Sequence, residues 1–392
     1  MMQGPGLLIL LLIAIIFVVV ATSRWKLHPF IVLIAAAYGI ALASGIPPLD
    51  VEALVREGFG KMISYIGLII IFGTLIGTLL EKTGAAITLA EAILTLFGKR
   101  FPGLAMSLIG YIVSIPVFCD SAFIILSSLK RSITQRTGSS SVMMSVALAT
   151  GLFASHTLVP PTPGPIAAAG NLGLSDQLGL VIVCGLAISI VPVLAGFVWA
   201  NHLAKRYPGG EPDNASFRAE IPDIPLPDSL PSLNRSLLPI FAPLLLIALG
   251  SIARYPSHPL GEGHLFSLLL IFGKPLNALI VGFLLALRLM PEWTERTLSG
   301  WMGEGLKSAS NILLITGAGG AFGHVLQATP IGSYLGDTLA SYHLGLLLPF
   351  IIAAALKTTQ GSSTVAMVAT SALIAPLLGT LGLDSTMGAI LS

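Results

Sequence analysis

The sequence predicts an all-α polytopic membrane protein made of two inverted repeats, each with a re-entrant helical hairpin. Of its 392 residues, 54% are hydrophobic and only 10% are charged. A soluble domain of this size needs more charge on its surface. Apolar segments of helix length recur along the chain, and the second half repeats part of the first. The apolar residues do not alternate in ten-residue strands, which argues against an outer-membrane barrel.

The first apolar segment, Leu7 to Thr22, predicts a retained membrane helix. No Lys or Arg precedes it, whereas Arg24 and Lys26 follow it. A cleaved secretory signal has positive charge ahead of its apolar core, so this charge order favours a helix that stays in the protein. Because cytoplasmic loops carry the excess of Lys and Arg, the N-terminus is expected outside.

Further apolar spans follow on both sides of a polar stretch that is rich in proline and charge. This stretch runs from Asn201 to Arg235 and predicts a cytoplasmic linker between an N-terminal half, 1–200, and a C-terminal half, 236–392. The segments 50–63 and 291–307 mix charged and apolar residues and indicate interfacial helices or solvated loops. The expected spans are 29–46, 64–81, 102–129, 142–157, 163–173, 177–200, 236–254, 265–290, 311–328 and 343–380.

The two halves share a repeated pattern. A shift of 246 residues aligns 61–80 with 307–326 without gaps, and eight of these twenty positions are identical, among them Gly73 with Gly319 and Gly77 with Gly323. An internal repeat around a polar linker is typical of secondary transporters.

Charge predicts that the segment 102–129 enters the membrane and returns. Bases flank both of its ends, so both ends are expected in the cytoplasm. Broken near Pro116, it gives two arms of about 13 residues, roughly 20 Å each at the rise of an α-helix. Such arms pass the middle of a hydrocarbon core that is ~30 Å thick. The flanking bases are Lys99, Arg100, Lys130, Arg131 and Arg136.

The matching segment of the second half, 345–380, has no flanking Lys or Arg and carries its one base, Lys357, inside. Both of its ends are therefore expected outside. Two hairpins that enter from opposite faces would place a site where their tips meet. The alternative is two ordinary kinked spans.

Asp120 is the most informative single residue, because a carboxylate in an apolar segment costs several kcal/mol and usually faces a functional cavity. Pro116, four residues earlier, breaks the helix. We expect Asp120 to hold a coupling proton or cation and Ser121 to bind substrate. Asp120 can also cap the second arm of the hairpin, since Asp is a good N-cap.

The second constellation lies in the other predicted hairpin. A buried Lys needs an anionic partner, which is either a substrate carboxylate or Asp120. A glycine turn and three hydroxyl residues then open the next arm, where helix-start N–H groups attract anions. Hydroxyls that pack between helices are the competing interpretation. The predicted substrate-binding residues here are Lys357, Gly361, Ser362, Ser363 and Thr364.

A third constellation is the broken span 154–165, with four prolines in its last six residues. Because proline cannot continue a helix interior, this span is expected to expose backbone groups to a cavity. Thr162 and Gly164 join the predicted substrate site. His156 either binds substrate and carries protons, since its ordinary pKa is near neutrality, or packs in the protein interior.

Other classes of site find no support. No spacing is typical of a metal site, a nucleophile elbow or a dinucleotide fold, so neither metal nor cofactor is predicted. The glycines at 317–323 indicate close helix packing. An intramembrane enzyme would need a nucleophile or a second carboxylate facing Asp120. Membrane lipid is an expected partner and nucleic acid is not, since a net charge of +2 gives no indication of it.

Several of these blocks resemble the gluconate permease (GntP) family of bacterial inner-membrane symporters. The blocks are Ser155-His156 with 158–165, Gly319–Phe322, Gly361–Ala366 and the Asp120 tip. The resemblance implies proton-coupled uptake of gluconate or a similar hydroxy-carboxylate, with D-serine or sodium coupling as alternatives. It also implies the inverted-repeat fold of the ion transporter superfamily and, by analogy alone, a homodimer.

The sequence departs from the family pattern at two points. Relatives often carry Arg where this chain has Lys357, and Lys meets a carboxylate as a point charge rather than as a fork. The mirror of the broken span is expected near position 401, whereas the sequence ends at Ser392. The C-terminal half is therefore expected to be truncated.

Overall fold

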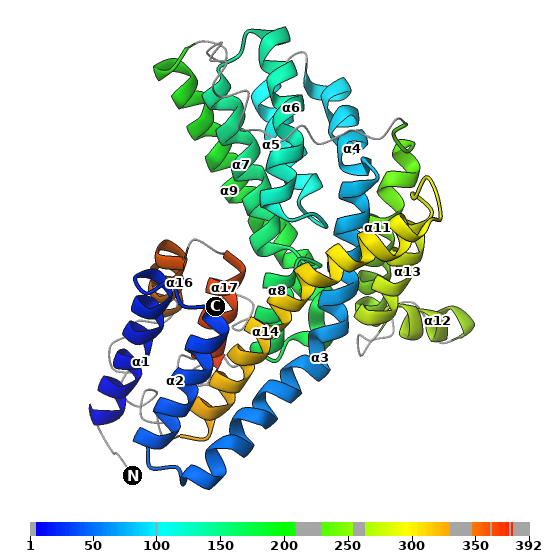
Figure 1. The fold of residues 1–392 in the computed structure, drawn as a ribbon. Coiled ribbons are helices and arrows are strands. Elements are labelled where there is room, and N and C mark those ends of the chain that lie inside the picture. Colours follow the sequence, from blue (N-terminus) through cyan, green and yellow to red (C-terminus); the bar gives the residue numbers. More distant parts are fainter. Residues whose placement is uncertain are drawn as a thin grey trace. The chain divides into compact units, whose positions relative to one another are not determined.

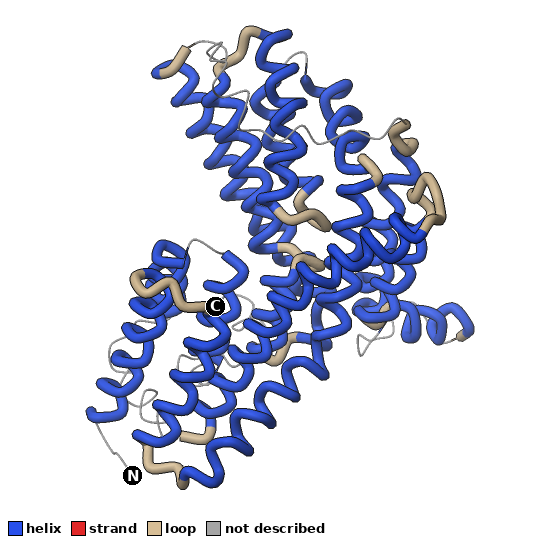
Figure 2. Tube along the Cα trace, in the orientation of Figure 1, coloured by secondary structure: helices blue, strands red, loops and turns tan. Residues whose placement is uncertain are grey.

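The computed structural model is all-helical in the part of the chain that it describes (Figures 1 and 2). Five of its helices are long and apolar enough to cross a membrane, or six if one bent pair counts as a span. The described residues are 5–98, 101–208, 229–253, 263–329, 347–360, 363–375 and 378.

The chain forms two compact units, which we describe separately. The first unit contains residues 1–70, 163–178 and 308–392. In it, α1 packs on α2 and on α16, and α17 packs on α16 and on α8. Its helices are α1 (Pro5–Ser23), α2 (Pro29–Ala43), the first part of α3 (Pro48–Lys82), α8 (Pro163–Asn171), most of α14 (Met302–Gln327), α16 (Leu347–Gln360) and α17 (Ser363–Ile374).

The second unit contains residues 71–162 and 179–307. Its largest contact surface lies between α5 and α7, and α11 packs on α13 and α4. Its helices are the rest of α3, α4 (Ala85–Ile93), the π-helical turn η1 (Leu94–Gly98), α5 (Pro102–Val113), α6 (Cys119–Thr137), α7 (Ser141–Leu158), α9 (Leu178–Arg206), α11 (Leu233–Ala253), α12 (His264–Phe272), α13 (Pro275–Leu287) and the π-helical turn η3 (Arg296–Trp301).

Local sequence explains where several helices begin. Helices α2, α5 and α13 each have proline in the first turn, where the missing N–H costs nothing. His28 caps α2 by accepting a hydrogen bond from the N–H of Phe30, and Ser140 caps α7 by accepting one from Met143. Side-chain acceptors at these positions satisfy backbone donors that the helix leaves open.

One expectation about these segments was wrong. The segments 50–63 and 291–307 are not separate interfacial helices, because the first lies inside the continuous helix α3 and the second leads through η3 into α14. The expected span 265–290 consists of two helices bent by 80°, which form a broken span or a re-entrant loop. Gly273 and Pro275 stand at this bend, and proline stops a helix from continuing.

The helix boundaries follow the repeat of 246 residues. Shifted by 246, α2 falls on 275–289 and α3 on 294–328, where the structure has α13 and the continuous run of η3 and α14. In the same way α5 falls on 348–359, the position of α16. The shift also exchanges the units, since α2 and α16 belong to the first unit and α13 and α5 to the second. The opposite orientation of the two halves in a membrane stays a prediction.

The polar linker is only partly described. Helix α9 continues to Arg206 and α11 begins at Leu233, while 209–228 lies outside the described residues. The division into halves at 201–235 stays a prediction, because each compact unit draws on both halves.

Candidate functional site

Two broken segments of the second unit lie against one face of α3. A side chain on Gly73 would place its Cβ 2.9 Å from the carbonyl oxygen of Pro161, and one on Gly77 would meet the carbonyl oxygen of Pro116 even more closely. Only glycine allows such close approach of backbone to backbone. Glycines on successive turns of α3 therefore fix where the Pro116 and Pro161 breaks sit.

The first break separates α5 from α6, as the sequence predicts. Helix α5 ends at Val113, and the Ser114 hydroxyl donates a 3.0 Å hydrogen bond to the carbonyl of Val117 within the break. The helices α5 and α6 then pack on each other and on α7. The return of this pair to one face of a membrane stays a prediction.

Asp120 lies in the first turn of α6, one residue after Cys119 begins the helix. The N-cap is Phe118, so Asp120 does not cap the helix in the way that we expected as an alternative. Its side chain is exposed, and the Cys119 thiol donates to its Oδ1 over 3.7 Å. A carboxylate in a first turn is stabilised by the helix dipole.

Glu81 is a residue that the sequence reasoning missed. It is partly buried in the last turn of α3, and its carboxylate interacts with the hydroxyl of Ser121. The neighbouring Lys82 pairs with Glu304, with Nζ 2.5 Å from Oε2. The position of Glu81 one turn after Gly77 on α3 was the signal in the sequence that could have identified it.

The second break separates α7 from α8 at residues 159–162 and contains a cis Pro160–Pro161 bond. The buried Thr162 hydroxyl donates to the carbonyls of Val159 at 2.7 Å and of His156 at 2.9 Å. The buried His156 ring lies 5.9 Å from the Phe118 ring, centroid to centroid. This ring contact joins the second break to the tip of α5 and α6.

The remaining predicted residues belong to the first unit. Lys357 is partly buried in the last turn of α16, and Ser363 and Thr364 begin α17. Gly164 lies at the start of α8, where a side chain would collide with the Met367 methyl and come 3.6 Å from the Cα of Thr364. Gly361 and Ser362, also predicted, lie outside the described residues.

The predicted site thus falls into two groups. Asp120, Ser121, His156 and Thr162 belong to the second unit, where Ser121 interacts with Glu81 of α3 and the His156 ring contacts the Phe118 ring. The starts of α8 and α17 come together in the first unit, through Gly164 and Thr364. No group of three or more His, Cys, Asp or Glu residues suited to a metal ion occurs among the described residues.

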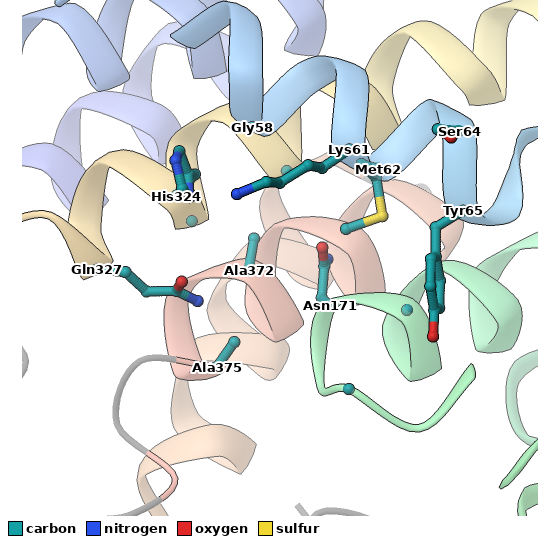
Figure 3. Close-up of a pocket in the computed structure, with 14 residues that line it drawn as sticks. Gly58, Lys61, Met62, Ser64, Tyr65, Asn171, His324, Gln327, Ala372 and Ala375 are labelled. Carbon is teal, nitrogen blue, oxygen red and sulfur yellow. The ribbon is translucent and has the colours of Figure 1, made fainter. Parts of the chain in front are cut away.

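The first unit also contains a pocket of about 500 Å³, lined by α3, α8, α14 and α17 (Figure 3). None of the sequence-predicted site residues lines it. At its α8 wall, the Asn171 amide donates to the carbonyl of Val368 at 3.1 Å and to the Ser371 hydroxyl at 2.8 Å. The polar residues that line it are Lys61, Ser64, Tyr65, Asn171, His324 and Gln327.

Helices broken at prolines beside close-packed glycines, within a set of apolar spans, define a polytopic membrane protein of the transporter class. The chain matches the family described as "GntP family permease" over residues 6–391, and it belongs to this family. It is therefore a permease rather than an enzyme, and its substrate is a small molecule.

Its relatives match along most of their length. The chain is 32% identical over 380 residues to a protein of Haemophilus influenzae named "Uncharacterized permease", covering 94% of this chain and 77% of the relative. It is 31% identical over 385 residues to the "Gluconate permease" of Pseudomonas aeruginosa, covering 96% and 84%. It is 31% identical over 377 residues to the "D-serine transporter DsdX" of Escherichia coli K12, covering 94% and 82%.

Proposed function

We propose that this protein is a secondary active transporter that carries gluconate or a related hydroxy-carboxylate together with protons across the bacterial inner membrane. The relative named as a gluconate permease supports this substrate class. One observation carries the proposal: the broken helices at Pro116 and Pro161 meet on the glycine face of α3. Broken backbone at membrane depth is tolerated where it lines protein or a water-filled cavity.

The substrate carboxylate binds to Lys357 and to the N–H groups at the start of α17. Lys357 lies in the last turn of α16, and Ser363 and Thr364 open α17, where the helix dipole favours negative charge. Gly361 and Ser362, which lie between these helices in the sequence, complete the proposed carboxylate site. Gly164 lets the start of α8 approach Thr364, which brings a second helix start to the same ligand.

The coupling proton is carried by the group in the second unit, which also offers hydroxyl groups to a passing substrate. Ser121 and Thr162 offer hydroxyls to the substrate, and Asp120 takes the proton, with His156 as a second carrier. Protonation removes the charge of the carboxylate, which lowers the free energy of moving the loaded site through a low-dielectric region. Alternating access then follows from movement of one repeat against the other.

A sodium-coupled carboxylate or D-serine carrier of the same fold is the alternative, and a relative named as a D-serine transporter supports it. D-serine adds an ammonium group to the carboxylate, and an exposed carboxylate such as Asp120 suits such a group. The location of the N-terminus outside and assembly as a homodimer complete the proposal.

Uptake of labelled gluconate into proteoliposomes tests the proposal. We expect accumulation to follow an inward proton gradient and to ignore a sodium gradient. Asp120→Asn should lose proton-driven accumulation about tenfold or more while keeping exchange of gluconate across the membrane, because only net transport needs the proton. Accumulation that follows sodium alone, or full proton-driven accumulation by Asp120→Asn, would contradict the coupling assignment.

A further inference from the structure

The pocket of the first unit is not part of the proposed transport site. It lies at the far ends of α8 and α17, at Asn171 and Ala372, whereas the proposed substrate groups lie at the starts of these helices. Nine residues separate Ser363 from Ala372, which is roughly 13 Å along a helix. The pocket is therefore a separate place on the same pair of helices.

Close packing of two helices sets the positions of the pocket's basic groups. A side chain on Gly58 would lie 2.6 Å from the Cβ of His324 and 2.8 Å from the carbonyl oxygen of Gly320. The absence of side chains at these glycines lets α3 cross α14 closely. Lys61, one turn after Gly58, and His324 are thereby held on neighbouring walls of the pocket, as Figure 3 shows.

Two basic side chains line the pocket, and the acid that pairs with them stands outside its lining. Lys61 and His324 line it, and none of the described lining residues is acidic. Glu57, one turn before Lys61 on α3, pairs with both bases: its Oε1 lies 2.5 Å from Lys61 Nζ, and its Oε2 lies 3.7 Å from His324 Nε2. The other nearby acid, Asp176, accepts a 3.1 Å hydrogen bond from the Tyr65 hydroxyl. An incoming carboxylate can replace the Glu57 side chain, which is about half exposed.

The neutral groups suit the hydroxyls of the same ligand. The Asn171 amide nitrogen is used by Val368 and Ser371, which leaves its carbonyl oxygen to accept a hydrogen bond. Gln327 extends into the same space from α14 (Figure 3) and can donate or accept. Ser64 adds a hydroxyl. One base flanked by hydroxyl-binding groups is the arrangement that a hydroxy-carboxylate requires.

We infer that this pocket is a second binding site for the transported carboxylate, which captures the anion before it reaches Lys357 and the start of α17. The inference rests on the proposed function. The volume of about 500 Å³ falls within the range of small-molecule sites. It exceeds what one small acid fills, so the ligand keeps part of its water. Because the ligand must displace Glu57 from Lys61, it binds weakly and exchanges rapidly, as a capture site requires.

Lys61→Gln tests the site, and the repeat supplies a matched control. The shift of 246 residues places Lys307 at the position equivalent to Lys61, in the other unit. In proteoliposomes at low ionic strength, Lys61→Gln should raise the KM for gluconate roughly fivefold and leave the maximal rate unchanged, because an exposed charge mainly steers the ligand. The increase should shrink at high salt. Lys61→Arg should keep the wild-type KM, and so should Lys307→Gln.

Equilibrium dialysis of the full chain with labelled gluconate supplies a second readout. Lys357→Gln should retain one weak site, which disappears when Lys61→Gln is added. A wild-type KM and unchanged salt dependence in a folded Lys61→Gln variant would overturn the inference, as would persistence of the weak site in the double variant. If the wild-type chain neither binds nor transports gluconate, the proposed function fails with this substrate, which is a different result.

Discussion

The two units use repeat-related segments of the same helices with different side-chain chemistry. In the first unit, the N-terminal part of α3 lies against the C-terminal part of α14, through Gly58 and His324. In the second unit, the start of α14 lies against the C-terminal part of α3, where a side chain on Gly305 would meet Leu75 at 2.8 Å and Thr78 at 3.1 Å. The shift of 246 residues carries Thr78 onto His324.

The chemistry at the two crossings differs although their geometry corresponds. Gln327 lines the pocket of the first unit, while its repeat equivalent Glu81 interacts with Ser121 in the second. Glu304 adds a further acid there and pairs with Lys82. The first crossing therefore has Lys61 and His324 paired with one acid, Glu57, and the second has two acids, Glu81 and Glu304, beside one base, Lys82. Repetition of a backbone arrangement does not conserve function, because single side chains at equivalent positions set the charge.

The equivalent glycines Gly77 and Gly323 contact different parts of the two predicted hairpins. Gly77 meets the break before α6 at Pro116, whereas its equivalent Gly323 meets Ala372, near the far end of α17. Backbone atoms therefore occupy the space beside Gly77 in the second unit, whereas Gly323 lines an open pocket in the first.

Alanine at the two equivalent glycines should show the largest difference. Gly77→Ala should lower the free energy of unfolding by about 1–3 kcal/mol, because the new Cβ collides with a backbone carbonyl that cannot move aside. Gly323→Ala should cost less, since its Cβ would lie 3.2 Å from the carbonyl oxygen of Ala372. Thermal unfolding in detergent measures both variants. Equal loss in the two variants would show that the second-unit contact is no tighter.

Substitutions that exchange the acid and the amide at the equivalent residues Glu81 and Gln327 should have the next largest effect. Glu81→Gln should lower gluconate uptake about tenfold, or roughly 1.4 kcal/mol in the barrier, because Ser121 loses a charged partner that orients its hydroxyl. Gln327→Glu should instead raise the KM, because it places a carboxylate in the pocket that captures an anion. Initial uptake rates over a range of gluconate concentrations separate the two outcomes. A lowered maximal rate in both variants would remove the distinction between the crossings.

The ion pairs should contribute least. Glu304→Gln breaks the pair with Lys82, and Glu57→Gln breaks the pair with Lys61. Each should change the free energy of unfolding by less than about 1 kcal/mol, because partly exposed pairs gain little over hydration. The Lys82 side chain, at 33% exposed, is less solvated than that of Lys61, at 63%, so the first variant should lose more. Unfolding at low and high salt ranks them, and the reverse order would contradict the exposure argument.

Some features of the site follow from short stretches of sequence. The helix break near Pro116 and the second break at 159–162 are local consequences of proline, and both were predicted. Two contacts were not predicted, the one between Glu81 and Ser121 and the one between Gly58 and His324. Each joins residues that are 40 or more positions apart, and no property of either segment alone identifies the other as its neighbour. The bend of 80° at Gly273 and Pro275 was also missed, although Gly273-Lys274-Pro275 interrupts the apolar run there.

The sequence alone determined that this is a polytopic membrane protein with broken helices and a repeat of 246 residues, because apolar length, proline and residue identity act locally and are read directly along the chain. Only the tertiary structure decided which face of α3 receives the broken segments and where a pocket remains. Close packing decides which helix faces contact each other, and the distance between two backbones depends on every side chain that lies between them.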